Sequence, residues 1–294
     1  MADKSYFCIR GHMKSGTNWV CQLLNLHPDI HSRGEYHWHR YFETYQKNNE
    51  IFHNLAEGEK SDPIIRKQLN QFVKSCMTQY ADPHAKFIGD RTPHTLYPIV
   101  LPRVPHISVV RDCRDVLVSK VFHHFNMPHI STLFQKSEMM RELHQEFKND
   151  PWFFQKNPDQ LLCNESFIRY TCSTWVSFMR CDRNTADKQP SLPLLFVRYE
   201  DLHEQIDEIR EKMYRFIGAD PELAASIPRY LRPGHNSENP DKFNRKGQVG
   251  DWQNYMTSQA KQWINEEAGS ELIKQGYVQD LDWTCPRLQL RKSA

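Results

Sequence analysis

Short apolar segments that alternate with helical patterns constrain the fold of this chain more than any other feature. Residues 5–10 form one such segment, and a tight turn then leads to an apolar-periodic pattern over residues 17–26. Further strands are expected at residues 86–89, 106–110 and 194–198. Strands that alternate with helices predict an α/β fold, with a central parallel sheet covered by helices on both faces in three α/β/α layers.

Helical patterns fill the stretches between the expected strands. Besides residues 17–26, they cover residues 62–80, 112–125, 138–148, 166–179 and 202–217. No Gly/Ser-rich or Pro-rich linker divides the 294 residues, so we expect a single domain over residues 1–294.

The composition excludes several classes of partner. Charged residues make up 25% of the chain and nearly balance, for a formal net charge of +2. This balance argues against a general nucleic-acid or membrane-surface binder, although it permits a local basic pocket. Neither a signal peptide nor a bilayer-spanning segment is recognisable, so we expect a cytoplasmic protein. The eight cysteines are scattered without a C-x-x-C pair, which is typical of reduced, mostly buried thiols.

The turn after the first strand has the chemistry of an anion-binding loop. Residues 11–19 read GHMKSGTNW, between a predicted strand and a predicted helix. Backbone N–H groups and the helix dipole favour an anion there, and Lys14, Ser15 and Thr17 add a charge and two hydroxyl donors. The lysine precedes the glycine, so this is not a Walker A loop. An ordinary capped turn with an exposed lysine fits the same residues.

Two further segments carry residues suited to a phosphate. In residues 111–119, Arg111 offers a planar fork at the end of a strand, and Ser119 follows two helical turns later. Residues 232–252 lack periodicity and contain Arg245-Lys246-Gly247, which suits an anion-binding lid. Taken singly, a solvated helix start and a basic surface loop explain these segments equally well.

In combination, these segments resemble the family of sulfotransferases that depend on 3′-phosphoadenosine-5′-phosphosulfate (PAPS). Residues 14–19, KSGTNW, resemble the 5′-phosphosulfate loop K-S-G-T-T-W, and Arg111 and Ser119 match the two 3′-phosphate positions with their spacing. Residues 245–252 match the signature R-K-G-x-x-G-D-W, and residues 199–202 match Y-E-D-L. The resemblance covers nearly the whole chain and implies a P-loop-like nucleotide-binding fold.

The resemblance also implies a reaction and a set of site residues. A sulfuryl group would pass from PAPS to an acceptor by in-line displacement, releasing the desulfonated nucleotide PAP, and no metal is required. Lys14 would stabilise the leaving group. The residues implied in cofactor binding are Lys14, Ser15, Gly16, Thr17, Asn18, Trp19, Arg111, Ser119, Tyr199, Arg245, Lys246 and Gly247. Trp19 and Tyr199 would flank the adenine, although Trp19 could equally belong to the core.

The catalytic base is open between two residues. The phenol- and steroid-type enzymes of the family use a histidine in K-T-H-x-P, but residues 90–94 read DRTPH, with proline in that place and His94 one position late. The glycan-type enzymes resemble K-T-P here and use a glutamate after the first helix, which Glu35 matches. We therefore expect Glu35 as the base and keep His94 as the alternative. Arg91 is expected to hold a sulfuryl oxygen in place of the family's lysine.

The acceptor is predicted to be a small molecule with a hydroxyl or amine group. Residues 36–39, YHWH, and 122–125, FHHF, are rich in aromatic rings and histidines, and residues 152–154 suit a lid. Many of these aromatics could equally be core. No metal site is expected among the histidines, because no carboxylate or cysteine is spaced to complete one.

Three alternatives to a small-molecule sulfotransferase can be considered: a glycan O-sulfotransferase, a nucleotide kinase and a non-catalytic nucleotide-binding module. A glycan-type catalytic pattern in a cytoplasmic chain fits a bacterial enzyme of secondary metabolism, while a glycan O-sulfotransferase is the competitor within the family. A nucleotide kinase would need a Walker lysine, which is absent. A non-catalytic nucleotide-binding module would be expected to lack Lys14 and every candidate base. The sequence names neither the acceptor nor the oligomeric state.

Overall fold

The computed structural model describes residues 4–52, 58–96, 100–127, 136–235, 238–242 and 245–284. These residues form two compact units, each assembled from three stretches of the chain. The first unit contains the stretch up to His12, Gly16–Val110 and Arg180–Leu231, and the second contains Met13–Ser15, Arg111–Met179 and the stretch from Arg232 onward. The expectation of a single domain stays a prediction.

Five parallel strands build the sheet of the first unit, in the order β2-β3-β1-β4-β5. Their bounds are β1 Ser5–Gly11, β2 Ile30–Gly34, β3 Phe87–Thr92, β4 His106–Val110 and β5 Leu194–Arg198. The central parallel sheet of an α/β fold is thus confirmed, and four of its strands lie where the sequence predicts them. β2 was not predicted, because its sequence IHSRG is short and alternates only Ile30 and Ser32 as buried residues.

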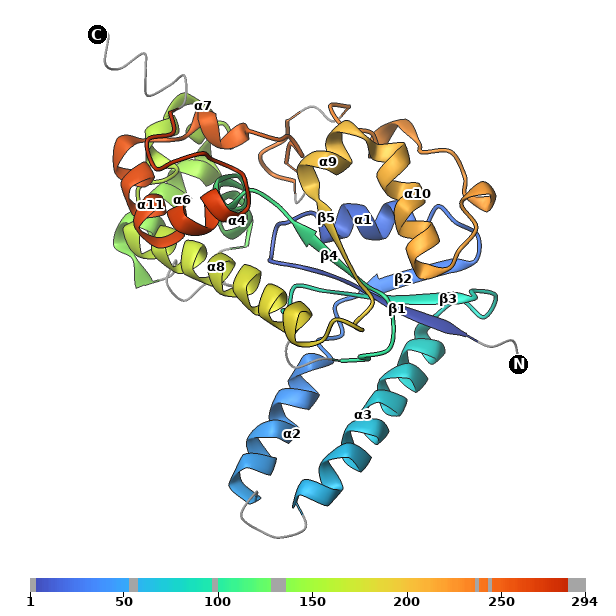
Figure 1. The fold of residues 1–294 in the computed structure, drawn as a ribbon. Helices are drawn as coiled ribbons and strands as arrows, with labels where there is room; N and C mark the ends of the chain where they lie inside the picture. The colour runs from blue at the N-terminus through green and yellow to red at the C-terminus, as the bar shows by residue number, and fades with distance from the viewer. Residues whose placement is uncertain are drawn as a thin grey trace. The chain divides into compact units, whose positions relative to one another are not determined.

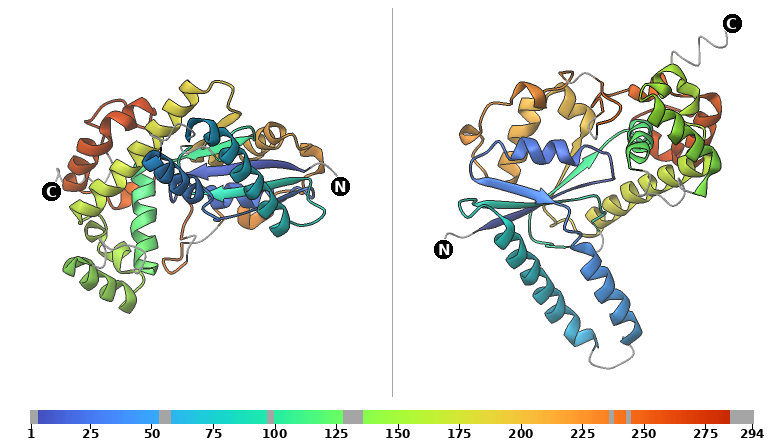
Figure 2. Two further views of the ribbon diagram at one scale, coloured as in Figure 1. Left: turned by 90° about the horizontal axis from the view of Figure 1, so that it is seen from below. Right: turned by 180° about the vertical axis from the view of Figure 1, so that it is seen from behind.

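The helices of the first unit cover the two faces of the sheet separately (Figure 1). α1 (Thr17–Leu24), α9 (Tyr199–Glu204) and α10 (Ile206–Ile217) lie on one face, and α2 (His39–Phe52) and α3 (Gly58–Tyr80) lie on the other. Figure 2 shows the same separation from behind. The helix expected over residues 202–217 is divided into α9 and α10, because Gln205 leaves the helical conformation at φ −131°.

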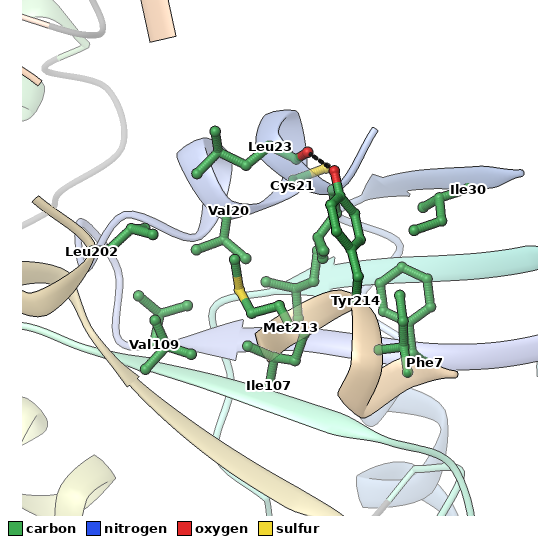
Figure 3. Packing of buried hydrophobic residues seen from close by; sticks show 14 of the residues in the cluster. Phe7, Val20, Cys21, Leu23, Ile30, Ile107, Val109, Leu202, Met213 and Tyr214 are labelled. Carbon is green, nitrogen blue, oxygen red and sulfur yellow. Dashed lines mark hydrogen bonds between the residues drawn. The ribbon is translucent and has the colours of Figure 1, made fainter. Parts of the chain in front are cut away.

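Strand alternation explains why β1 needs cover on both faces. Phe7 and Ile9 point into a core with α1 and α10, in which Tyr214 and Met213 are fully buried (Figure 3). Cys8, between them, belongs to the opposite core with α2 and α3. Successive side chains of a strand point to opposite faces, so a central strand with three buried apolar residues in a row has to be covered on both faces.

The second unit is helical. Its elements are α4 (Cys113–Asn126), α6 (Glu138–Asn149), α7 (Phe153–Lys156), most of α8 (Glu165–Lys188) and α11 (Ser258–Lys274). The short 3-10 helices of the two units are Pro158–Gln160, Pro221–Leu223, Arg229–Leu231 and Asp251–Asn254. α2 and α11 were not predicted from the sequence. In the described ranges, no helix is both long and apolar enough to cross a membrane.

We predict that Tyr214→Phe lowers the free energy of unfolding by about 1 kcal/mol, because a buried hydroxyl donor is lost. The Tyr214 hydroxyl donates to the Leu23 carbonyl at 2.7 Å and ties α10 to α1 (Figure 3). Urea unfolding would measure the change. Tyr80→Phe is the control, since Tyr80 is 59% exposed. Equal stabilities of the two variants would contradict the prediction.

Candidate functional site

The side chains predicted to be functional in the first unit follow the carboxyl ends of its strands. The turn after β1 leads to Gly16, Glu35 directly follows β2, and Tyr199 directly follows β5. Arg91 is the penultimate residue of β3, and His94 lies two residues beyond this strand. Parallel strands end at one edge of their sheet, so these segments of very different sequence position share that edge.

Gly16 is required by its conformation and by its neighbour. Its φ is +101°, and a Cβ at this position would lie 2.5 Å from Cδ2 of the Tyr199 ring. Gly16 is also the N-cap of α1 and offers no side-chain hydrogen bond to the first turn. The first turn of α1, which holds Thr17, Asn18 and Trp19, therefore has no side-chain cap of its own and is suited to an anion.

An aromatic group surrounds this turn. The Trp19 ring meets Tyr199 edge-on with centroids 5.4 Å apart, and His203 lies 5.2 Å from Trp19 and 5.0 Å from Tyr199. The Trp19 indole N–H donates to the Leu231 carbonyl at 2.9 Å. Tyr199 is only 5% exposed. The structure thus brings together Gly16, Trp19 and Tyr199, as expected of neighbouring residues in one nucleotide pocket, and adds His203.

Glu35 forms an ion pair with Arg91. Arg91 Nη1 donates to Glu35 Oε1 at 2.8 Å, and His37 Nε2 lies 3.9 Å from Glu35 Oε2. The Glu35 side chain is 35% exposed, so it is accessible to a substrate hydroxyl. Two residues predicted to be catalytic, from β3 and from the segment after β2, are therefore in direct contact.

His94 lies among other imidazoles. Its ring centroid is 3.2 Å from that of His39, and its Nε2 is 3.4 Å from His37 Nδ1. Burial, and after it the neighbouring His39 and His37, lower the pKa of His94 to about 3. Burial likewise lowers the pKa of His39 to about 4. An imidazole of such low basicity is a weak proton acceptor at neutral pH.

A small pocket adjoins His39 and His94. Asp90 and Thr92 of β3 and Arg10 of β1 also line it. Burial raises the pKa of Asp90 to about 8, against the lowering effect of the backbone N–H groups of Tyr36 and Arg91.

In the second unit, Arg111 joins two of the predicted motifs. Its Nη1 donates to the Lys14 carbonyl at 3.2 Å, and its Nη2 donates to the Gln248 carbonyl at 2.9 Å. The side chain is 9% exposed. Arg111 also directs its carbonyl to the indole N–H of Trp175 at 3.0 Å, which fixes the backbone before α4. The Arg111 guanidinium therefore connects the backbone at Lys14, in the turn after β1, to the backbone at Gln248, in the C-terminal loop.

Asp115 fixes the C-terminal loop to α4. Its two carboxylate oxygens accept the N–H groups of Gly250 at 2.7 Å and Trp252 at 3.0 Å. Burial raises the pKa of Asp115, while Arg111 and these N–H groups oppose the rise. A buried carboxylate with two backbone donors holds the loop in one register.

Arg245 and Lys246 are held by carboxylates. Arg245 contacts Glu238 and Asp251, and Lys246 Nζ lies 2.8 Å from Asp251 Oδ1 and 3.3 Å from Glu238 Oε2. The Arg245 guanidinium also lies over the Phe122 ring at 4.2 Å. These contacts place two cations side by side, as a phosphate site needs.

The remaining predicted residues have simple placements. Ser119 is half-buried on α4, and Gly247 is exposed with φ +63°. Lys14 interacts electrostatically with His123. Burial, and after it the positive charge of Lys14, lower the pKa of His123 to about 4. Phe243 and Asn244, which precede the motif of residues 245–252, lie outside the described residues.

Several aromatics considered for the acceptor pocket are core residues. Phe122 and Phe125 are each 2% exposed, Phe154 is fully buried, and they pack on one another with centroids 4.7 to 5.8 Å from Phe154. Trp152 is 46% exposed. For these three phenylalanines the core alternative therefore holds.

Sequence reasoning missed the residues that orient the predicted ones. Asp115, Glu238 and Asp251 each hold a predicted cation or loop, and His203 extends the aromatic group. Asp115 lies four residues after Arg111, and this spacing was the one sequence feature that could have indicated its role. The groups that it binds, the N–H groups of Gly250 and Trp252, are far away in the sequence and could not have been predicted from it.

The residues present fit an anionic nucleotide. Ser15 is fully buried, and its Oγ has no hydrogen-bond partner among the described residues. A buried hydroxyl without a partner is costly unless a ligand satisfies it. A hydroxyl of this kind, beside Lys14, is suited to a phosphate or sulfate oxygen.

A parallel α/β sheet with a glycine turn between its first strand and first helix is the architecture of the P-loop-like class of nucleotide-binding folds. The sequence model of the sulfotransferase domain family matches residues 5–274. The chain therefore belongs to the sulfotransferase family, and it is a PAPS-dependent sulfotransferase.

Known proteins similar to this chain include two named as sulfotransferases and a retinol dehydratase. Sulfotransferase 1E1 of Bos taurus is 24% identical over 268 residues, which cover 83% of this chain and 75% of the bovine protein. Mouse sulfotransferase SULT7A1, solved with PAP, aligns with a TM-score of 0.47 and 15% identity over 91% of this chain and 84% of the mouse chain. Retinol dehydratase with androsterone and PAP aligns with a TM-score of 0.47 and 17% identity, over 96% and 83% of the two chains. The assignment rests on the family match and not on these two alignments.

We predict that Gly16→Ala destabilises the protein more than Gly276→Ala. Both glycines have positive φ, so both variants suffer about 1 kcal/mol of backbone strain. Only Gly16→Ala also meets a neighbour, the Tyr199 ring, whereas nothing lies within 4 Å of a Cβ at Gly276. Urea unfolding of both variants would measure the difference, and equal losses would show that the Tyr199 contact does not constrain this turn.

Proposed function

We propose that this enzyme transfers a sulfuryl group from PAPS to a hydroxyl or amine group of a small organic acceptor of secondary metabolism. The proposal is supported above all by one observation: within each unit, the segments that carry the sequence motifs contact one another. Gly16 packs on Tyr199 in the first unit, and Arg111 and Asp115 bond to the 248–252 loop in the second. Segments that share one ligand are expected to be neighbours, and these are.

We assign the nucleotide contacts by the chemistry of each residue. Lys14, Ser15, Gly16, Thr17 and Asn18 would hold the 5′-phosphosulfate, supported by the orphan Ser15 hydroxyl. Arg111, Ser119, Arg245, Lys246 and Gly247 would hold the 3′-phosphate. Glu238 and Asp251 keep the two adjacent cations in place until the phosphate binds. Trp19 and Tyr199 would contact the adenine. PAPS is a co-substrate, and PAP is the product that leaves.

The transfer is a balanced displacement. The acceptor oxygen or nitrogen forms a bond to sulfur, and the bond from sulfur to the bridging oxygen of PAPS breaks, so PAP leaves with the electron pair. Lys14 stabilises the negative charge that develops on this oxygen. Glu35 takes the acceptor proton. Arg91, which holds Glu35 at 2.8 Å, orients the base and presents further guanidinium N–H groups to a sulfuryl oxygen.

Glu35 is preferred to His94 as the base for a geometric and an electrostatic reason. Glu35 is one-third exposed and directly follows β2, at the edge of the sheet where ligands of this fold bind. His94 Nε2 faces His37, and burial lowers the pKa of His94 to about 3.

Lys14→Ala is expected to lower the rate of transfer about 100- to 1,000-fold, the usual cost of removing one donor that stabilises developing charge. Labelled sulfate from PAPS would be followed onto a panel of small alcohols, phenols, amines and oligosaccharides, with PAP binding measured in parallel. Lys148→Ala, which removes an exposed lysine of α6, should match the wild type. Labelling of the oligosaccharides alone would favour the glycan alternative, and a folded wild type without PAP binding would overturn the proposal.

Glu35→Gln is expected to lower kcat about 100- to 10,000-fold while PAP still binds, because the variant keeps the shape of the side chain but cannot take a proton. The matched control is Glu43→Gln, an exposed carboxylate on α2. The alternative predicts the reverse pattern, with kcat near normal in Glu35→Gln and lost in His94→Ala. Unchanged turnover of Arg91→Ala would remove Arg91 from the mechanism.

A further inference from the structure

Three histidines of the first unit gather at one point beside the sheet edge. His37 follows β2, His39 begins α2 and His94 follows β3. One ring nitrogen of each lies within 4.8 Å of the other two. In the part of the chain that the structure describes, this is the one group of three or more His, Cys, Asp or Glu residues with such a geometry.

The spacing of two of these nitrogens matches a tetrahedral zinc site. Zinc binds imidazole nitrogen at about 2.0–2.1 Å, which places two nitrogens of a tetrahedron roughly 3.4 Å apart. His37 Nδ1 and His94 Nε2 lie 3.4 Å apart. This separation allows the two nitrogens to share an ion. The His94 ring, whose centroid is 3.2 Å from that of His39, would turn so that the nitrogen of His39 also faces the ion.

The third ring has a buried nitrogen that needs a partner. His39 is 6% exposed, and its Nδ1 is buried without a hydrogen-bond partner among the described residues. His39 and His94 both line the small pocket beside β3. A buried ring nitrogen without a partner carries a desolvation cost that a metal–nitrogen bond would remove.

A carboxylate stands behind the cluster. Glu35 Oε2 is 3.9 Å from His37 Nε2, the ring nitrogen that does not face His94. Metal-bound histidines commonly present their second nitrogen to a carboxylate, which fixes the tautomer and the orientation of the ring.

We propose that His37, His39 and His94 bind one zinc-class divalent transition metal ion, with a water molecule as the fourth ligand. Three imidazoles and one exchangeable position are a common zinc ligand set. The absence of a nearby carboxylate or cysteine ligand in the sequence gave no reason to expect such a site. The fold supplies it, by placing His94 of the segment after β3 against the two histidines that follow β2.

Zinc uptake by the whole chain tests the proposal without any transfer reaction. Metal-stripped protein would be incubated with zinc, passed through gel filtration and analysed for metal. We expect one zinc ion per chain in the wild type. In His39→Ala we expect the affinity for zinc to fall by about 100-fold or more, because loss of a ligand costs at least as much as loss of the group that hydrogen-bonds to a ligand. His84→Ala, an exposed histidine of the same unit, should bind zinc like the wild type.

The visible absorption spectrum of bound Co²⁺ is a second test, and it reports the coordination geometry of the ion. Co²⁺ in the wild-type protein should show the intense visible bands of a tetrahedral ion, and His37→Gln should abolish them. The His37 side chain is 34% exposed, so this variant remains informative if His39→Ala fails to fold. The proposal is overturned by a wild type that retains no zinc, by equal retention in wild type and His39→Ala, by loss in His84→Ala, or by an octahedral cobalt spectrum.

Discussion

The structure of the first unit depends on one constraint, the burial of a parallel sheet on both faces. β1 lies at its centre, with Phe7 and Ile9 packed on α1 and α10 and Cys8 packed on the opposite side. Parallel strands need a crossover for each connection, and all their carboxyl ends then meet at one edge. This is why Gly16, Glu35 and Tyr199, which are far apart in the sequence, follow strand ends that lie together.

The residues of the second unit's sequence motifs are held by carboxylates, of which Asp251 belongs to the R-K-G-x-x-G-D-W motif and Glu238 lies outside it. Asp115 holds the backbone of Gly250 and Trp252, and Glu238 and Asp251 hold the two adjacent cations. A cation pair without such partners would repel itself and spread its charge over many rotamers. The carboxylates keep the positive charge in place, which is the ordering that the proposed phosphate site would otherwise require on binding.

The region after β2 and β3 combines an ion pair with a cluster of imidazoles. Glu35 and Arg91 form the pair, and His37 links it to His39 and His94. The exposures of the two groups overlap, since Glu35 is 35% and His37 is 34% exposed, and of the three histidines only His39 is buried. A partly exposed carboxylate can exchange a proton with a substrate, and imidazoles this close together can bind a metal ion or one another.

The sequence by itself determined the class of fold, four of the five strands and the segments that carry the phosphate chemistry, because strand and helix periodicity and the order of the motifs are local properties. It did not reveal β2, whose five residues alternate too weakly, or the break at Gln205 between α9 and α10. The tertiary structure alone decided which residues meet. Asp115 finds Gly250, and His94 finds His37, across long stretches of chain, because hydrogen bonds and burial act through space and leave no periodic signal in the sequence.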